Sequence, residues 1–174
     1  AAGAVTRAID ISPTRLSRVE ENLRRTQLQA QLEAQDALEH GGESYDIVLL
    51  DAPCSATGTI RRHPDLPYAK DGSDFFELIE LQGRMIDHAI SLLNPGGRLV
   101  FCTCSLLPDE GECQIEEALK RHSGLKIDHS ALETDIVDSQ MKAAPEGLRL
   151  RPDMLSDKGG LDGFFISILR WDGQ

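Results

Sequence analysis

Residues 45–54, with the sequence YDIVLLDAPC, decide the fold class of this chain. The near-continuous apolar run at 45–50 predicts a strand that is buried on both faces of a sheet. Proline fixes its own φ and holds the preceding residue extended, so the chain leaves this strand rigidly. Because ligands bind beyond the carboxyl ends of strands in an open α/β sheet, Asp51 and Cys54 are presented where chemistry takes place.

Residues 97–105, GRLVFCTCS, repeat this arrangement of an apolar run that ends in a cysteine. Alternation along a strand points Cys102 and Cys104 to the same face. We expect Cys102 to lie in the core and Cys104, at the strand end, to be exposed. Two thiols delivered to one sheet edge from two strands indicate covalent chemistry.

Strand and helix patterns alternate along the rest of the chain. Ser12-Pro13 supplies an N-cap and a proline at the first helical position, and an apolar stripe follows to about residue 26. The strongest helical stripe covers 75–93, before Asn94-Pro95-Gly96-Gly97. We also expect a helix at 109–121, strands at 5–10, 28–34, 98–103, 125–127 and 164–169, and irregular segments at 55–72 and 130–160. The order predicts one α/β domain with three layers and a mostly parallel sheet.

The composition limits the class of protein and its partners. The chain has 174 residues, of which 40% are hydrophobic, and four cysteines without a regular framework. It has neither a signal peptide nor an apolar run of the roughly 20 residues that cross a membrane, so we expect a cytoplasmic protein with no membrane partner. The net charge of −11 counts against a free-standing nucleic-acid binder, although Arg61-Arg62-His63 beyond Cys54 supplies a local basic rim.

Two acidic residues follow two successive predicted strands. Asp10 stands where nucleotide-binding α/β folds hold a ribose by its hydroxyls, and Asp36 follows the next strand. Taken alone, each of these acids is typical of an ordinary strand end or helix cap. Together they predict a nucleoside site, with the ribose at Asp10 and an adenine amino group near Asp36.

The cysteines do not form a typical metal or redox motif. Cys102, Cys104 and Cys113 lack the paired spacing of zinc sites, so we expect no metal. Cys113 falls on a predicted helix and is expected to be structural. A thiol redox protein is disfavoured because neither Cys54 nor Cys104 lies in a C-x-x-C motif.

Three motifs together resemble a known family. They are DAPCSATG at 51–58, TCS at 103–105 and DGFF at 162–165. The chain resembles the Fmu/Sun family of RNA cytosine-5 methyltransferases from residue 5 to residue 169. Within this family it is most similar to the bacterial enzymes that act on small-subunit ribosomal RNA. The resemblance implies a Rossmann-like fold, S-adenosylmethionine as cofactor and RNA as partner, with 16S ribosomal RNA preferred and transfer RNA as the alternative.

The resemblance also implies a role for each motif residue. Cys104 would add to carbon 6 of cytosine as the nucleophile. Asp51 would stabilise a proton at N3 and, with Pro53, lie near the methyl donor, while Cys54 would serve in releasing the product. S-adenosylmethionine would lie against the two acids of the nucleoside site, and the basic rim at 61–63 would contact RNA.

One part of the family pattern has no counterpart here. Family members carry a glycine-rich cofactor loop that ends in Gly-Gly-Lys upstream of the position of Asp10, and an RNA-binding portion before it. We therefore expect residues 1–174 to be an N-terminally truncated catalytic domain that lacks the first strand of its fold. A missing strand exposes two sheet edges, so the alternative is a non-catalytic module that pairs these edges in a homo-oligomer.

Overall fold

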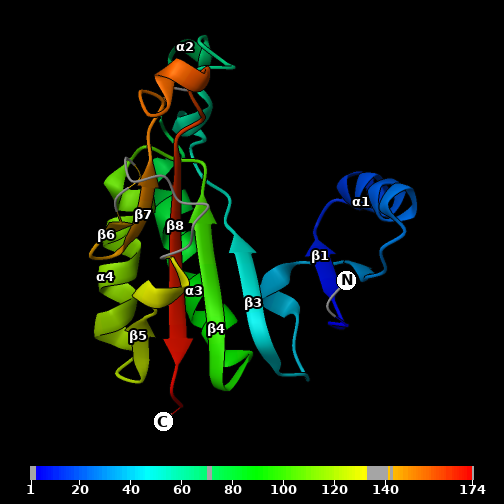
Figure 1. The fold of residues 1–174 in the computed structure, drawn as a ribbon. Helices are drawn as coiled ribbons and strands as arrows, with labels where there is room; N and C mark the ends of the chain where they lie inside the picture. Colours follow the sequence, from blue (N-terminus) through cyan, green and yellow to red (C-terminus); the bar gives the residue numbers. More distant parts are fainter. Residues whose placement is uncertain (1–2, 70–71, 133–140, 142, 174) are drawn as a thin grey trace. The chain divides into compact units, whose positions relative to one another are not determined.

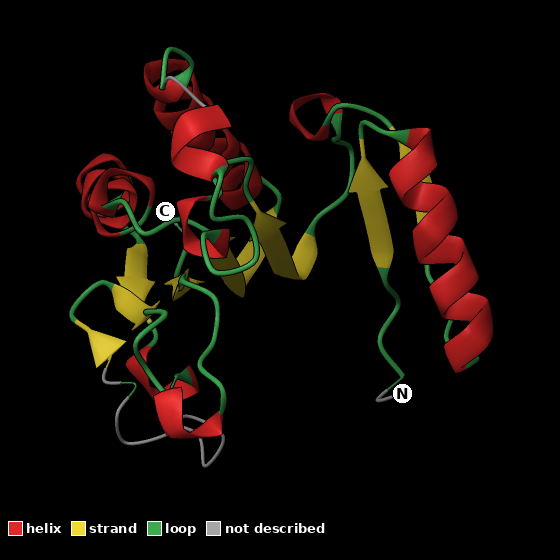
Figure 2. Ribbon diagram, turned by 90° about the horizontal axis from the view of Figure 1, so that it is seen from above, coloured by secondary structure: helices red, strands yellow, loops and turns green. Residues whose placement is uncertain are grey.

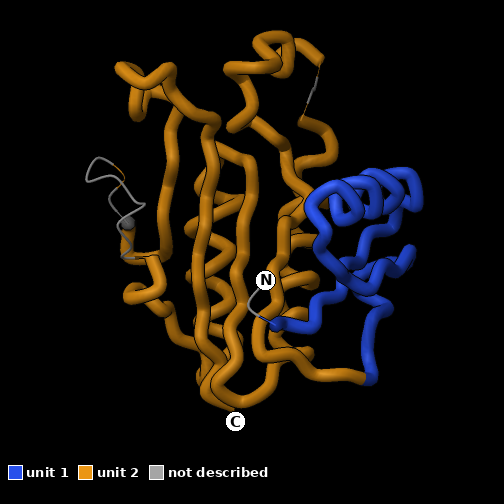
Figure 3. The backbone as a smooth tube through the Cα atoms, turned by 45° about the vertical axis from the view of Figure 1, so that its right-hand side comes forward, with its two compact units in different colours: residues 1–42 blue, residues 43–174 orange. Residues whose placement is uncertain are grey.

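The fold is taken from a computed structural model that describes residues 3–69, 72–132, 141 and 143–173. The chain divides into two compact units, Ala1–Gly42 and Glu43–Gln174, which Figure 3 draws in different colours. Each unit is described by itself.

The first unit is a strand–helix–strand arrangement. Strand β1 (Arg7–Asp10) pairs in parallel with β2 (Gln31–Ala34), and helix α1 (Pro13–Thr26) connects them. The predicted N-cap is confirmed, because the Ser12 side chain accepts a hydrogen bond from the Arg15 amide. The 3₁₀ turn η1 (Ala37–Glu39) follows β2.

The second unit is built on a six-stranded sheet in the order β3-β4-β8-β7-β6, with β5 also paired to β8 (Figure 1). Strand β3 pairs in parallel with β4, whereas β8 runs antiparallel to β4, β5 and β7. Thus β3, β4, β5 and β7 share one direction and β8 is reversed. The bounds are β3 (Tyr45–Asp51), β4 (Leu93–Thr103), β5 (Leu125–Ile127), β6 (Ala143–Ala144), β7 (Gly147–Leu150) and β8 (Phe164–Trp171).

Two helices cover one face of this sheet and enclose the core. Figure 2, seen from above, shows α3 (Phe75–Ser91) and α4 (Glu112–Arg121) on the same side of the strands. The stripe predicted at 75–93 faces the sheet through fully buried Ile86. The other fully buried apolar side chains are Leu99, Phe101, Ile115, Phe165 and Leu169, together with the smaller Ala118. None of the described helices is both long and apolar enough to cross a membrane.

Strand β3 differs from the sequence expectation of burial on both faces. Val48 and Leu50 pack toward the core, but Ile47 is 62% exposed and Leu49 is 69% exposed. The reason is that β3 lies at the edge of the described sheet and α3 packs against only one of its faces.

The segments expected to be irregular contain short elements. Residues 55–72 include the 3₁₀ turn η2 (Thr57–Thr59) and helix α2 (Leu66–Ala69). In 130–160, strands β6 and β7 and the turn η5 (Ser156–Lys158) are present, while 133–140 and 142 lie outside the described residues. The turns η3 (Pro108–Glu110) and η4 (His129–Ala131) precede α4 and follow β5.

Candidate active site

The structure brings the two predicted thiols together. Because β3 and β4 are parallel neighbours with Asp51 opposite Cys102, their carboxyl ends meet at one sheet edge. Cys54 Sγ lies 3.5 Å from Cys104 Sγ, within hydrogen-bonding distance for sulfur. The backbone joins the same segments, since the Gly58 amide donates to the Cys104 carbonyl at 2.9 Å. The edge therefore holds a fixed thiol pair.

The two thiols of this pair differ in acidity. The hydrogen bond from Cys54 lowers the pKa of Cys104 to about 7, against opposing effects of burial and of the Asp51 and Glu110 charges. The same bond, followed by burial, raises the pKa of Cys54. A thiolate is the reactive form of cysteine, so Cys104 is the more readily ionised thiol of the pair and Cys54 keeps its proton to higher pH.

The remaining cysteines lie in different settings. Cys102 is 7% exposed, as predicted for a core residue, and burial together with the Asp51 charge raises its pKa to about 12. Cys113 is exposed on α4, so the expectation of a structural role is wrong, because that helix buries the neighbouring Gln114 and Ile115 instead. Among the described residues, no group of three His, Cys, Asp or Glu is placed to hold a metal ion.

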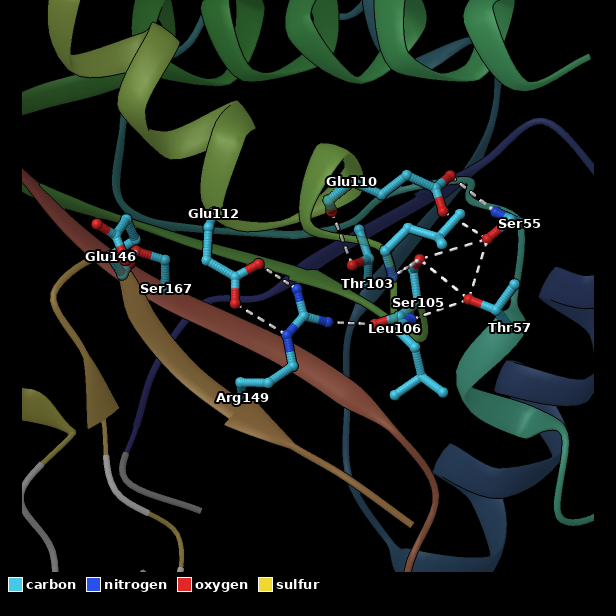
Figure 4. A network of polar contacts seen from close by, with 11 residues as sticks. Ser55, Thr57, Thr103, Ser105, Leu106, Glu110, Glu112, Glu146, Arg149 and Ser167 are labelled. Carbon is cyan, nitrogen blue, oxygen red and sulfur yellow. Dashed lines mark hydrogen bonds and ion pairs between the residues drawn. The ribbon is translucent and has the colours of Figure 1, made fainter.

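A buried carboxylate supports the Cys54 segment, as Figure 4 shows. Glu110, on η3, is fully buried, and its Oε1 accepts from the Ser55 amide at 2.8 Å and from Gln82 Nε2 at 3.0 Å. Its Oε2 accepts from Ser55 Oγ at 2.5 Å. Gln82 on α3 is also fully buried and donates to the Pro53 carbonyl at 2.8 Å. Sequence reasoning missed both residues, although a glutamine within the apolar stripe of 75–93 was an available signal.

Three hydroxyls connect this carboxylate to Ser105, the residue after Cys104, and an arginine contacts the backbone of Ser105 (Figure 4). Ser105 Oγ lies 3.3 Å from Ser55 Oγ and 3.2 Å from Thr57 Oγ1. Arg149, on β7, donates to the Ser105 carbonyl and forms a bidentate ion pair with Glu112. The residue that follows each thiol is therefore held by side chains from other elements.

The other predicted residues near this edge are accessible. Asp51 is the last residue of β3 and is exposed, as is Pro53. Arg61, Arg62 and His63 are also exposed. They remain candidates for contact with a cofactor or with RNA.

The DGFF motif lies against the Cys54 segment. Arg62 Nε contacts Asp162 Oδ2 at 2.6 Å, and the Gly163 amide donates to the Gly58 carbonyl at 2.8 Å. These two contacts place the basic rim beside the closing motif, and with the bond from the Gly58 amide to the Cys104 carbonyl they join all three sequence motifs at one end of the sheet.

The two acids predicted for a nucleoside site lie in the first unit. Asp10 ends β1, and its Oδ1 accepts from the Ser12 amide at 2.7 Å and contacts Arg15 Nη2 at 2.9 Å. Asp36 caps η1 by accepting from the Leu38 amide at 2.9 Å. Asp10 lies at, and Asp36 just beyond, the carboxyl end of a parallel strand, and both supply oxygen acceptors, the groups that suit a ribose hydroxyl and an amino group.

The described part of the second unit includes two cavities. One, of about 400 Å³, is lined by Ser55 and Thr57 together with apolar side chains of which Leu66, Phe75 and Leu107 are examples. The other, of about 380 Å³, lies between α3 and α4 and includes Cys113. Of these two, only the cavity of about 400 Å³ is lined by residues of the DAPCSATG motif that carries Cys54.

The chain is similar to proteins whose names describe ribosomal RNA methylation. It is 46% identical over 166 residues to ribosomal RNA small subunit methyltransferase B of Shewanella oneidensis, covering 93% of this chain and 36% of that protein. It is 43% identical over 169 residues to the protein of the same name from Pseudomonas syringae pv. tomato, with the same coverage of 93% and 36%. The chain thus spans about a third of the length of the curated relatives that it matches.

A solved structure extends this likeness to the fold. The crystal structure of NSun6 from Pyrococcus horikoshii with SFG has a TM-score of 0.81 and 29% identity, covering 98% of this chain and 42% of that one. The predicted Rossmann-like methyltransferase fold is confirmed. A sequence model of one family, described as "16S rRNA methyltransferase RsmB/F", matches residues 1–170. On the strength of that match, which covers nearly every residue, this chain belongs to the RsmB/F family of 16S rRNA methyltransferases.

Proposed function

We propose that residues 1–174 form the catalytic part of an RNA methyltransferase that acts on carbon 5 of cytosine in small-subunit ribosomal RNA. The observation that carries the proposal is the pair of thiols 3.5 Å apart at the carboxyl ends of two parallel strands. Methylation at carbon 5 is a reaction that needs such a thiol, because this carbon is a poor nucleophile until carbon 6 has gained a substituent. The names of the family and of the relatives support RNA as the substrate.

In the proposed reaction the Cys104 thiolate forms a bond to carbon 6, and the electron pair of the C5–C6 double bond becomes available at carbon 5. Asp51, exposed at the end of β3, holds a proton at N3 of the base. After methyl transfer, carbon 5 loses its proton to water and the bond between Cys104 and carbon 6 breaks. The Cys54 thiol, 3.5 Å from Cys104 Sγ, donates a hydrogen bond to the departing thiolate.

S-adenosylmethionine is the proposed cofactor, and when bound it supplies the electrophilic methyl group. Asp10 and Asp36 would accept hydrogen bonds from its ribose and adenine, while Asp51 and Pro53 would line the end that faces the base. The acceptor chemistry of the two acids fits this role, and the similar NSun6 structure was determined with SFG.

The exposed basic rim at 61–63 is proposed to contact the RNA backbone. It stands beside the segment that carries Cys54, and its position gives local positive charge to a chain whose net charge is −11. Small-subunit ribosomal RNA is preferred to transfer RNA because the curated relatives carry ribosomal RNA in their names.

The proposal is tested with the chain, together with any further residues that its gene encodes, incubated with methyl-labelled S-adenosylmethionine and 16S ribosomal RNA. Label is expected at carbon 5 of cytosine. Cys104→Ala is expected to abolish both transfer and covalent complex formation. Cys54→Ala is expected to retain an RNA–protein complex that survives denaturing electrophoresis, because release of the Cys104 thiolate is slowed.

Several outcomes decide between the alternatives. Label at adenine or guanine contradicts the proposed chemistry, and equal, adduct-free loss in both cysteine variants contradicts the division of roles. Label found in transfer RNA and not in 16S ribosomal RNA would show that transfer RNA is the substrate. Absence of S-adenosylmethionine binding together with a dimeric mass would favour the non-catalytic module.

A further inference from the structure

The thiol pair depends on contacts that neither cysteine makes itself. The two sulfur atoms come from segments 50 positions apart in the chain, and a hydrogen bond between them needs both segments to be held. Sulfur–sulfur hydrogen bonds are weak, so the pair does not hold its own geometry. Something else must set the separation of 3.5 Å.

Glu110 contacts both segments at once (Figure 4). Its carboxylate accepts from the amide and the hydroxyl of Ser55, the residue after Cys54. Its backbone carbonyl accepts from Thr103 Oγ1 at 2.9 Å, and Thr103 is the residue before Cys104. A single fully buried residue therefore joins the neighbours of the two thiols.

The carboxylate is held firmly enough to act as such a support. Glu110 and Thr103 are fully buried, and Gln82, also fully buried, donates to the same carboxylate from α3. Buried polar networks in which every member is satisfied restrict the local structure strongly, because any displaced member is left without a partner. Within the described residues, no buried side-chain nitrogen or oxygen is left without a hydrogen-bond partner.

We propose that Glu110 is a positioning residue that sets the separation of the Cys54 and Cys104 sulfur atoms and so keeps the Cys104 thiol reactive. It acts through Ser55 on one side and Thr103 on the other. The catalytic meaning of this inference rests on the proposed function, but its test uses neither RNA nor S-adenosylmethionine. Failure of the inference and failure of the proposed function are therefore distinguishable.

The test is the pH dependence of alkylation of each cysteine by iodoacetamide, read by peptide mass spectrometry. The titratable groups that act on Cys104 are Cys54, Asp51 and Glu110. A return of the Cys104 pKa from about 7 to its ordinary 9.0 lowers the thiolate fraction at pH 7 by as much as roughly fifty-fold. Cys113, exposed on α4, is an internal standard in the same sample.

Two variants separate the contacts of Glu110 from its charge. Glu110→Ala removes the carboxylate contacts with Ser55 and Gln82 and keeps the backbone carbonyl that accepts from Thr103. The Cys104 midpoint is therefore expected to rise and its alkylation at pH 7 to fall by at least ten-fold. In Glu110→Gln the amide oxygen can still accept from the Ser55 and Gln82 nitrogen atoms, and the amide nitrogen can donate to Ser55 Oγ. Because the Glu110 charge raises the pKa of both thiols, the Cys104 midpoint of Glu110→Gln is expected to stay or fall.

Ser167→Ala is the matched control for loss of a buried polar contact. Ser167 is fully buried in β8, and its hydroxyl donates to the Glu146 carbonyl at 2.7 Å. This control is expected to leave the Cys104 midpoint unchanged. If Glu110→Ala does not fold by circular dichroism, Glu110→Asp, whose carboxylate is one carbon shorter, is read in its place with the same expectation.

An unchanged midpoint in a folded Glu110→Ala or Glu110→Asp protein would overturn the inference. A rise of the same size in Glu110→Gln would also overturn it, because the charge and not the contacts would then control Cys104. A rise of the Cys104 midpoint in Ser167→Ala would also overturn it, because loss of any buried polar contact in the sheet would then produce the effect.

Discussion

Replacement of Gly58 by alanine is predicted to separate the three motifs at 51–58, 103–105 and 162–165, although it replaces none of the functional side chains. An added Cβ would lie 2.0 Å from the Gly163 carbonyl oxygen, 2.6 Å from its carbon and 2.8 Å from the Cys104 carbonyl oxygen. All three are backbone atoms, so no side-chain rotation relieves the overlap. The backbone around residue 58 must move away from the end of β4 and from the DGFF motif.

The expected loss of stability follows from these contacts. Overpacking costs about 1–3 kcal/mol, and each lost backbone hydrogen bond costs about 0.5–1.5 kcal/mol. Two such bonds pass through this glycine, from the Gly58 amide to the Cys104 carbonyl at 2.9 Å and from the Gly163 amide to the Gly58 carbonyl at 2.8 Å. Their sum gives about 2–6 kcal/mol, and a domain of this size loses roughly 2–4 °C of Tm per kcal/mol.

Differential scanning calorimetry measures this change directly, with Gly41→Ala as the control. Gly41 has no heavy atom within 4 Å of an added Cβ, so its replacement is expected to change stability by less than about 0.5 kcal/mol. The alkylation of Cys104 by iodoacetamide at pH 7 is also expected to fall in the Gly58→Ala protein. A Gly58→Ala protein that melts within about 2 °C of the parent would refute the close approach of the three motifs.

Two further predictions concern stability. Phe165→Ala removes a fully buried ring and is expected to lower the free energy of unfolding, measured with denaturant, by about 3–5 kcal/mol. Phe76 is 81% exposed, so Phe76→Ala is expected to lower it by less than about 0.5 kcal/mol. Equal losses in the two variants would contradict the placement of the core. Burial opposes ionisation of Asp87, but hydrogen bonds from Arg121 and His122 lower its pKa. The folded pKa is depressed, so the Asp87 carboxylate adds stability above the ordinary carboxyl pKa and loses it as the pH falls through the lowered one. Asp87→Asn is expected to cost less than about 1 kcal/mol at pH 7, because the carboxylate is partly exposed and screened by solvent, and to cost nothing below the lowered pKa. A constant difference in stability across pH would contradict this assignment.

The sequence alone determined the elements whose signals are local. The N-cap and proline at 12–13 start α1 at Pro13, and the apolar stripe at 75–93 predicts α3 to within two residues at its end. The apolar runs at 45–50 and 98–103 predict β3 and the end of β4, and thus the edge at which Cys54 and Cys104 meet. These predictions succeed because helix periodicity, turn residues and strand runs depend on neighbours in the chain.

Only the tertiary structure decided which side chains support that edge. Glu110 reaches Ser55 across 55 positions of sequence, and Arg149 reaches the Ser105 carbonyl across 44. The strand that carries Arg149 has no clear period, and the exposure of Ile47 and Leu49 depends on which face of β3 a helix covers. The sequence motifs identify the groups that can react. The separation of the two thiols and the position of the buried carboxylate beside them depend on long-range packing, which no local sequence pattern predicts.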